Sequence, residues 1–293
     1  MMTVKVEIEI LRTPSAMQEW SRSKRLYGRT IGVVPTMGAL HEGHLSLLRK
    51  SSSECDETIV TIFVNPLQFG PSEDFNKYPR DEGTDLMMAA DAGATVAYCP
   101  GVEAMYREGS SIYVIEDEMS KVLCGKSRPA HFGGVLTVVA KLFNATLPDR
   151  AYFGKKDYQQ MLLIRKMADE LDFPLEIVPC PVVRESDGLA MSSRNKYLSE
   201  TQRLDALCLK AGIENAKMKF EDGERNPREI ESAAREMIEG IKSARIDYIE
   251  CRDAETLADI DLIENSAVLA LAVFIGDTRL IDNTVLIPSE GGI

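Results

Sequence analysis

Short apolar runs alternate with helical patterns over residues 25–180. The run IGVVPT at 31–36 precedes two glycines and then leucines at helical spacing, which indicates a strand, a glycine loop and a helix. Further strands are expected at 58–64, 94–98, 150–153 and 174–179, and further helices at 84–92, 134–147 and 157–171. Strands that are apolar throughout are covered on both faces, so the alternation predicts an α/β protein with a doubly wound parallel sheet.

The pattern changes after residue 180. Two prolines and the polar segment 185–195 interrupt the alternation, which predicts a boundary near residue 182 and two domains, 1–182 and 183–293. Beyond the boundary, amphipathic helices are expected at 199–220 and 227–243, and strands at 246–251, 267–275 and 280–285. These elements predict a smaller C-terminal α+β domain.

Composition and charge narrow the range of partners and compartments. The chain has 46 acidic against 34 basic residues, and its net charge of −12 disfavours general binding to nucleic acid or to an anionic membrane. The longest apolar run, 267–275, is far shorter than the roughly 20 residues of a membrane-spanning helix. The start, MMTVKVEIEI, lacks the apolar segment of a secretory signal, and the six cysteines are widely spaced without a C-x-x-C pair. We therefore expect a cytoplasmic protein with reduced thiols.

Two of the three histidines lie in PTMGALHEGH, residues 35–44, directly after the first expected strand. Open parallel sheets bind ligands at the carboxyl ends of their strands, where helix N-termini offer free N–H groups to phosphates. Gly38 allows a tight turn, Gly43 leaves room for a ligand, and His41 and His44 are spaced to face one polyphosphate. The alternative is that they are ordinary capping or surface histidines. Zinc is disfavoured, because H-E-G-H is not H-E-x-x-H.

A second candidate phosphate site is FGKKDYQQ, residues 153–160, where a strand end, a glycine and a polar run open a helix. Lys156 would reach a phosphoryl group, and Asp157 would cap the helix or bind a ribose hydroxyl. The amides of Gln159 and Gln160 both donate and accept hydrogen bonds. The alternative is that Lys156 is a solvated surface charge.

Two loops add polar side chains. MSSRN at 191–195 combines two hydroxyls and a guanidinium that suit a developing oxyanion, in a segment able to close over a nucleotide. The alternative is that Ser192, Ser193 and Asn195 cap the helix that follows Leu198.

NPLQFG at 65–70 follows the second strand and directs Asn65 and Gln68 toward the same crevice, although such a loop is also a common turn. Asp81, Glu82 and Asp85 are candidates to hold Mg²⁺ through water. The alternative for them is the acidic first turn of a helix.

Six ordered segments resemble the pantoate–β-alanine ligase family: PTMGALHEGHLSLL, IFVNPLQFG, YPRDEGTDL, HFGGVLTVV, FGKKDYQQ and VVRESDGLAMSSRN. The resemblance spans residue 31 to about 200, and GDTRLIDN near residue 280 is similar to the closing strand of the family. It implies a Rossmann-like N-terminal domain of the nucleotidylyltransferase superfamily and a homodimer formed through that domain. It also implies that pantoate and ATP give pantoyl adenylate and pyrophosphate, after which β-alanine displaces AMP to form pantothenate.

The resemblance assigns residues by matched position. ATP contacts would be Met37, Gly38, Ala39, Leu40, His41, Glu42, Gly43, His44, Gly154, Lys155, Lys156, Asp157, Val183, Met191, Ser192, Ser193 and Arg194. The catalytic group among them would be His41, His44, Lys156 and Arg194, with His44 as a proton donor.

The same matching assigns the acid substrates and the metal. Gln68 and Gln160 would bind pantoate, and Gln68 would also lie near β-alanine. Asp85 would bind Mg²⁺, although Thr84 stands where some relatives have an acidic residue, and Lys155 stands where many have Glu. Arg128 and His131 also fall in a matched segment, where a structural role for His131 is an equal expectation.

The sequence thus predicts an ATP- and Mg²⁺-dependent ligase whose second domain acts as a lid that keeps water from the acyl adenylate. Two alternatives share the nucleotide loops: a nucleotidylyltransferase that keeps AMP in its product, and a nucleotide-binding module without turnover. NPLQFG and KDYQQ favour the ligase over the first, and the intact His44, Lys156 and Arg194 argue against the second.

Overall fold

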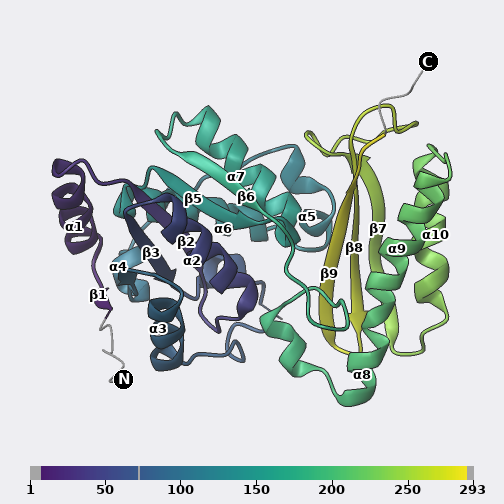
Figure 1. Cartoon of the computed structure of the whole chain (residues 1–293), viewed down its shortest axis with the longest axis horizontal. Helices are drawn as coiled ribbons and strands as arrows, with labels where there is room; N and C mark the ends of the chain where they lie inside the picture. The colour runs from purple at the N-terminus through teal and green to yellow at the C-terminus, as the bar shows by residue number, and fades with distance from the viewer. Residues whose placement is uncertain (1–7, 72, 289–293) are drawn as a thin grey trace. The chain divides into compact units, whose positions relative to one another are not determined.

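A computed structural model describes residues 8–71 and 73–288, which form two compact units (Figure 1). The first unit contains the described residues up to 116 together with 128–155 and 163–181. The second unit contains 117–127, 156–162 and the described residues from 182 onward. Because two short segments before residue 182 group with the second unit, the domain limits 1–182 and 183–293 and the lid role remain predictions.

A parallel sheet of six strands forms the centre of the first unit (Figure 1). Its strands, in spatial order, are β1 (Glu9–Leu11), β4 (Val96–Tyr98), β3 (Glu57–Ile62), β2 (Ile31–Thr36), β5 (Arg150–Gly154) and β6 (Glu176–Cys180). All five neighbouring pairs are parallel. The doubly wound α/β fold expected from the sequence is therefore confirmed, and the order reverses at β2, which lies between β3 and β5.

Helices and short turns of 3-10 helix complete the first unit. They are α1 (Pro14–Leu26), α2 (Glu42–Glu54), η1 (Pro66–Gln68), α3 (Glu82–Asp91), α4 (Val102–Met105), α6 (His131–Thr146) and the part of α7 (Tyr158–Glu170) from residue 163 onward. Helix α2 packs closely against β2. A methyl group added to Gly32 of β2 would be only 2.2 Å from the Oγ of Ser51 in α2. Strand β1 and helix α1 were not predicted from the sequence, although Thr13 caps α1 and Pro14 begins it.

The second unit contains an antiparallel sheet of β7 (Ala244–Asp253), β8 (Ala267–Ile275) and β9 (Thr278–Leu286), with β8 in the centre. Its other elements are η2 (Met119–Lys121), α5 (Cys124–Ser127), η3 (Lys155–Asp157), the start of α7 (Tyr158–Glu170), η4 (Ser193–Tyr197), α8 (Glu200–Asp205), α9 (Leu207–Glu221) and α10 (Pro227–Glu239). The single helix expected at 199–220 is wrong, since α8 and α9 meet at Ala206, and α10 ends before residue 243.

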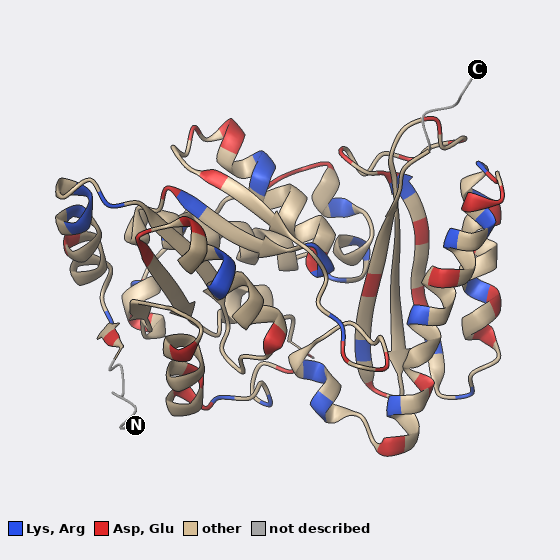
Figure 2. Ribbon diagram, in the orientation of Figure 1, with Lys and Arg blue, Asp and Glu red and all other residues tan. Residues whose placement is uncertain are grey.

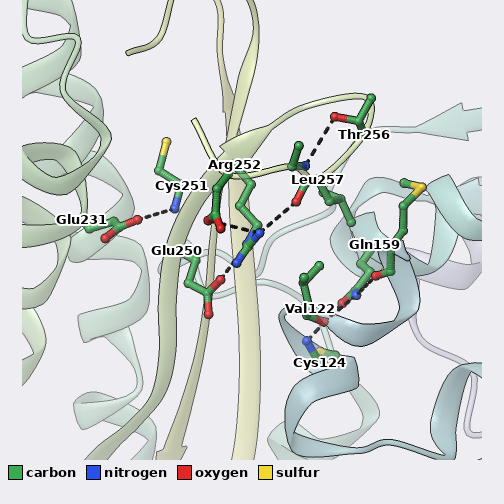
Figure 3. A network of polar contacts seen from close by, with 12 residues as sticks. Val122, Cys124, Gln159, Glu231, Glu250, Cys251, Arg252, Thr256 and Leu257 are labelled. Atoms are coloured by element: carbon green, nitrogen blue, oxygen red, sulfur yellow. Dashed lines mark hydrogen bonds and ion pairs between the residues drawn. The ribbon is translucent and has the colours of Figure 1, made fainter. Parts of the chain in front are cut away.

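The apolar faces of α9 and α10 pack with one face of this sheet in a core that includes Ile213, Ile230 and Leu271. Charged residues of both signs mark the remaining surface of the two helices (Figure 2). Polar contacts fix the edge strand β7: Cys251 N donates to Glu231 of α10, and Arg252 donates to Glu250 and to the carbonyl of Leu257 (Figure 3). Among the described helices, none has the length and apolar character needed to span a bilayer.

Candidate functional site

Three neighbouring strands of the first unit end at the same edge of the sheet. The segment Met37–His44 follows β2, Asn65–Gln68 follows β3, and Gly154 ends β5. Two of these loops touch, because the Nε2 of Gln68 lies 3.0 Å from the Sδ of Met37. The structure therefore brings the expected pantoate glutamine to the expected ATP loop, at the edge where open parallel sheets bind ligands.

The loop after β2 is sharply turned. Gly38 N donates to the Oγ1 of Thr36 at 3.1 Å, and both Gly38 (φ 80°) and Ala39 (φ 51°) adopt left-handed backbone conformations. His41 then caps α2, since its Nδ1 accepts a hydrogen bond from Gly43 N at 3.1 Å. Because Nδ1 is an acceptor here, a neutral His41 carries its proton on Nε2.

The rings of His41 and His44 are stacked, with centroids 4.1 Å apart and an angle of 30° between their planes. Both side chains are half-buried at the first turn of α2. The capping alternative is therefore correct for Nδ1 of His41, and this role orients the ring. The spacing of the two histidines brings their rings together, as the sequence predicts.

Asp85, on the first turn of α3, binds the backbone of this loop. Its Oδ2 accepts from Ala39 N at 2.8 Å and its Oδ1 from Leu40 N at 2.7 Å, and only 3% of the residue is exposed. Both carboxylate oxygens are thus bound to successive N–H groups of the predicted ATP loop. Sequence reasoning offered Asp85 as a metal ligand or as part of an acidic first turn and missed this contact.

The other two acidic candidates, Asp81 and Glu82, also have protein partners. Asp81 caps the helix by accepting from Thr84 N at 3.1 Å, and Glu82 forms an ion pair with Arg12 at 2.6 Å. Within the described ranges, no group of three or more His, Cys, Asp or Glu residues is arranged to hold a metal. Mg²⁺ needs several oxygen ligands or waters in an octahedral arrangement. Asp85 does not fit this role, because it is buried and both of its carboxylate oxygens accept backbone hydrogen bonds.

The side chain of Gln68 is buried and oriented by its neighbours. Its Oε1 accepts from the Nδ2 of Asn65 at 3.1 Å, and that amide also donates to the carbonyl of Gly134. Tyr106 donates in turn to the Oδ1 of Asn65 at 2.8 Å. The NH₂ group of Gln68 donates to the thioether of Met37, which is a weak acceptor, so this group is well placed to donate to a stronger one.

Arg128 and His131 fix the backbone at Gln68. The Nη2 of Arg128 and the Nδ1–H of His131 both donate to the carbonyl of Gln68, at 3.2 and 2.9 Å. Arg128 also pairs with Glu73 at 2.6 Å, and although burial of Glu73 opposes its charge, this pairing holds its pKa below the usual value. This contact of His131 with the Gln68 carbonyl fits the structural role that was expected for it.

Lys156 belongs to the second unit and is not a solvated surface lysine. Only 19% of its side chain is exposed, and its Nζ lies 3.8 Å from the Oδ1 of Asp157. Its carbonyl accepts from the Nδ2 of Asn283 on β9 at 2.8 Å. Gln160 is half-buried on the first turn of α7.

Gln159 differs from Gln160 in having its amide occupied by backbone groups (Figure 3). Its Nε2 donates to the carbonyls of Met119 and Val122, each at 2.8 Å, and its Oε1 accepts from Cys124 N at 3.1 Å. The amide of Gln159 therefore holds residues 119–124 to α7. From the sequence, the amides of both glutamines were expected to donate and accept hydrogen bonds. In the structure, the amide of Gln159 does so with backbone groups.

The segment expected as an irregular loop begins with a short hairpin. Met191 N donates to the carbonyl of Val183 at 3.0 Å, and Arg184 and Ala190 form an antiparallel bridge. The turn closes at Gly188, whose φ of 95° suits glycine. The hairpin brings together Val183 and Met191, two of the expected nucleotide contacts.

An ion pair attaches this hairpin to β9. Both terminal nitrogens of Arg184 donate to Asp282, at 2.7 and 2.9 Å, and the Asp282 side chain is 1% exposed. The hydrogen bonds from Arg184 to Asp282 raise the pKa of the guanidinium. Since the next residue, Asn283, binds the carbonyl of Lys156, adjacent residues of β9 hold both groups of expected ATP contacts in this unit. The sequence pattern did not reveal this anchor, which joins segments 98 residues apart.

The serine segment follows the hairpin and forms η4. The Oγ of Ser192 accepts from Arg194 N at 3.3 Å and caps this short helix, while Ser193 is buried. The amide of Asn195 donates to Glu185 in the hairpin at 2.6 Å. The helix after Leu198 is capped by Ser199, so the alternative that the preceding serines cap it is wrong.

The expected site residues thus form two groups, one in each unit. The sheet edge of the first unit gathers Met37–His44, Gln68, Gly154 and Lys155, and β9 of the second unit holds Lys156 and the 183–195 segment. The two groups offer imidazole, ammonium, guanidinium and helix N-terminal donors, which suit phosphate groups and developing negative charge.

Comparison with known proteins shows similarity over nearly the whole chain. The family model described as pantoate-beta-alanine ligase matches residues 9–285. The chain is 50% identical to the pantothenate synthetase of Sulfurihydrogenibium sp. (strain YO3AOP1) over 277 residues, which cover 94% of this chain and 99% of that protein. It is also 50% identical over 279 residues to the pantothenate synthetase of Moorella thermoacetica, covering 95% of this chain and 99% of that protein.

Solved structures show the same fold. The crystal structure of pantothenate synthetase from Thermus thermophilus has a TM-score of 0.90 at 39% identity and covers 96% of this chain and 100% of that one. Pantoate-beta-alanine ligase from Francisella tularensis, solved in complex with beta-gamma ATP and beta-alanine, has a TM-score of 0.79 at 33% identity and covers 95% and 97%.

Proposed function

Because this chain belongs to the pantoate–β-alanine ligase family, we propose that it condenses (R)-pantoate with β-alanine to pantothenate and converts ATP to AMP and pyrophosphate. The reaction proceeds in two steps through pantoyl adenylate. The observation that carries the proposal is the contact at the edge of the parallel sheet, where Gln68 meets the loop that leads to His41 and His44. An amide suited to a hydroxy acid thus adjoins a loop suited to a nucleotide.

In the first step, a carboxylate oxygen of pantoate attacks the α-phosphorus of ATP, and the bond to the pyrophosphate oxygen breaks. Attack of one anion on another needs positioning and neutralisation rather than a protein nucleophile. His41, through its Nε2–H, and His44 donate to phosphoryl oxygens at the start of α2, where the helix dipole also favours negative charge. Lys156 and Arg194 are the proposed sources of positive charge for this step.

In the second step, the amine of β-alanine attacks the acyl carbonyl of pantoyl adenylate, and AMP leaves. Gln68 and Gln160 bind the hydroxyl and carboxyl groups of pantoate through their amides, and Gln68 lies where the amine approaches. The contacts that hold Gln68 by its backbone and side chain support this role, because a fixed amide loses little entropy on binding.

The proposal includes Mg²⁺ bound mainly by the phosphates of ATP and by water. This is a common form of Mg²⁺ in phosphoryl-transfer sites, and it requires no carboxylate cage. Bound in this way, the ion would neutralise phosphate charge. Asp81, Glu82 and Asp85 are engaged with protein partners, which supports delivery of the metal by the nucleotide.

The proposal also includes a cytoplasmic homodimer. The six cysteines are all free thiols, which suits a reducing compartment. Three apolar side chains of the first unit, Ile112, Tyr113 and Ile115, are 88%, 53% and 70% exposed, and such a cluster favours contact with another surface. Sedimentation of the wild-type protein and of an I112E/I115E variant tests the dimer, which the variant should dissociate.

Product analysis by mass spectrometry tests the reaction. The protein is incubated with ATP, Mg²⁺ and D-pantoate, with β-alanine present or omitted. We expect pantothenate and AMP when β-alanine is present, and enzyme-bound pantoyl adenylate without it. A product that retains AMP when β-alanine is present would indicate a nucleotidylyltransferase, and folded, ATP-binding protein that releases no pyrophosphate would exclude the ligase.

A variant of Gln68 tests the site assignment. Replacing Gln68 with Ala should raise KM for pantoate and leave KM for ATP nearly unchanged, because the lost amide faces the acid substrate. Steady-state kinetics with each substrate varied in turn distinguishes the two effects. An equal loss of affinity for both ligands would contradict the assignment.

A further inference from the structure

Asp85 is a buried carboxylate whose two oxygens both bind the nucleotide loop. They accept from the N–H groups of Ala39 and Leu40 at 2.8 and 2.7 Å, across more than 40 residues of sequence. Two successive N–H groups that converge on one carboxylate form an anion-binding concavity. In this chain, that concavity is occupied by a side chain of α3.

The backbone of the loop needs such support. Gly38 and Ala39 have φ values of 80° and 51°, and alanine adopts left-handed backbone only at an energetic cost. A methyl group on Gly38 would lie 2.8 Å from the Oδ2 of Asp85, so the close approach of the carboxylate also requires glycine there. Hydrogen bonds to a charged acceptor are stronger than neutral ones, and they offset the cost at Ala39.

The loop carries groups that the reaction uses. Met37, one residue before the left-handed pair, contacts Gln68, and His41, directly after Leu40, caps α2 and stacks on His44. A change in the backbone at Ala39 and Leu40 would therefore move the start of α2 and the contact with Gln68 together. Asp85 fixes the part of the loop that lies between these two contacts.

We propose that Asp85 is a positioning residue, which holds the Met37–Leu40 backbone in the conformation that binds ATP, and that it does not bind Mg²⁺. The proposal rests on the nucleotide-binding role of this loop in the proposed function. A magnesium ion at Asp85 would have to replace hydrogen bonds to Ala39 or Leu40 and enter a site of which 3% is exposed. The carboxylate acts through the loop, without touching the substrate.

The D85N variant separates the two roles. Asn keeps the size of the side chain but turns one acceptor into an NH₂ group that faces a backbone N–H. We expect ATP to bind about 10- to 100-fold more weakly, because displacements near 1 Å have effects of this size. ATP binding is measured by calorimetry in EDTA and again in Mg²⁺. A positioning role predicts a loss of affinity under both conditions, whereas a metal ligand predicts a loss only in Mg²⁺.

Metal titration and a matched variant complete this test. The Mg²⁺ concentration for half-maximal pyrophosphate release should be unchanged in D85N, and excess Mg²⁺ should not restore the rate. The control is D91N, which makes the same change of charge at an exposed position of the same helix and should behave as wild type. Restoration of D85N by Mg²⁺, or wild-type ATP affinity of D85N in EDTA, would overturn the proposal.

A suppressor tests the backbone argument directly. Glycine adopts the φ of 51° at position 39 without strain, so A39G should recover part of the ATP affinity that D85N loses. If D85N alone does not fold, the comparison of A39G with A39G/D85N measures the same loss. No recovery by A39G in folded D85N would contradict the positioning role. Because these assays read ATP binding, they remain decisive even if product analysis identifies a different acid substrate.

Discussion

Two adjacent glycines near the start of α6 differ sharply in their surroundings. A methyl group on Gly134 would lie 2.3 Å from the carbonyl oxygen of Leu67 and 2.7 Å from Gln68 N. A methyl group on Gly133 would meet only the carbonyl oxygen of Val114, at the ordinary distance of 3.9 Å. Replacing each with alanine therefore makes the same chemical change in the same helix, and only G134A pushes on the backbone that carries the proposed pantoate amide.

The structure sets the size of the expected effect. Carbon–oxygen contacts normally begin near about 3.3 Å, so G134A requires a shift of roughly 1 Å between α6 and the Leu67–Gln68 backbone. Overpacking of this kind typically costs about 1–3 kcal/mol of folding free energy. Alanine is favoured over glycine in helices by about 0.8–1 kcal/mol, a gain that both variants share. We therefore expect G134A to be less stable than G133A by about 1–3 kcal/mol.

The functional effect follows from the position of Gln68. A displacement of about 1 Å in a positioning group lowers the rate by up to about 10²-fold, and we expect a loss of this order in kcat/KM for pantoate in G134A. ATP affinity should change much less, because the added methyl group meets the Leu67–Gln68 backbone and not the loop of His41 and His44. The assays are thermal unfolding and steady-state kinetics of both variants beside wild type. Wild-type stability and kinetics of G134A, or an equal loss in G133A, would refute this reasoning.

Three further substitutions test other parts of the site. H44A should lower kcat by about 10²- to 10³-fold, as loss of a transition-state hydrogen bond does, and unchanged turnover would remove His44 from the mechanism. G154A should leave the melting temperature unchanged, because no atom lies within 4 Å of its added methyl group. If ATP passes close to this backbone, G154A should raise KM for ATP by about tenfold, which is equivalent to roughly 1.4 kcal/mol. An unchanged KM for ATP would exclude a close approach of ATP to Gly154. D282N breaks a buried ion pair, a change that costs about 3–5 kcal/mol, with the lower end expected because the Arg184 side chain is 30% exposed. Its melting temperature should fall and its KM for ATP should rise without a matching change for pantoate, and a normal melting temperature would contradict the anchoring role.

The sequence predicted β2 and β8 well because both are apolar and buried over almost their whole length. IGVVPT in the parallel sheet and AVLALAVFI in the antiparallel sheet both became strands with the expected limits. The elements that were missed or misjudged lack such a signal. Strand β1 has only three residues, and the separation of α8 from α9 at Ala206 occurs inside one continuous amphipathic pattern.

The grouping of candidate residues was predictable where they follow the end of a strand. The loops containing His41, Gln68 and Gly154 were found because parallel strands place their carboxyl ends at one edge. The supporting contacts of Asp85 and Asp282 were not found. They join segments 45 and 98 residues apart, and local patterns carry no information about such pairings.

These hidden contacts also explain how an acidic chain can present a site for anions. The net charge of −12 would oppose ATP more strongly if the carboxylates near the nucleotide loops had no partners. Instead, Asp85 accepts two backbone hydrogen bonds, Glu73 pairs with Arg128, and Asp282 pairs with Arg184. Arginines compensate the charges of Glu73 and Asp282, and two N–H groups stabilise the carboxylate of Asp85, whereas the cations assigned to the substrate lie on neighbouring segments. The sign of the field at such a site follows from which charges are paired, and net charge alone does not determine it.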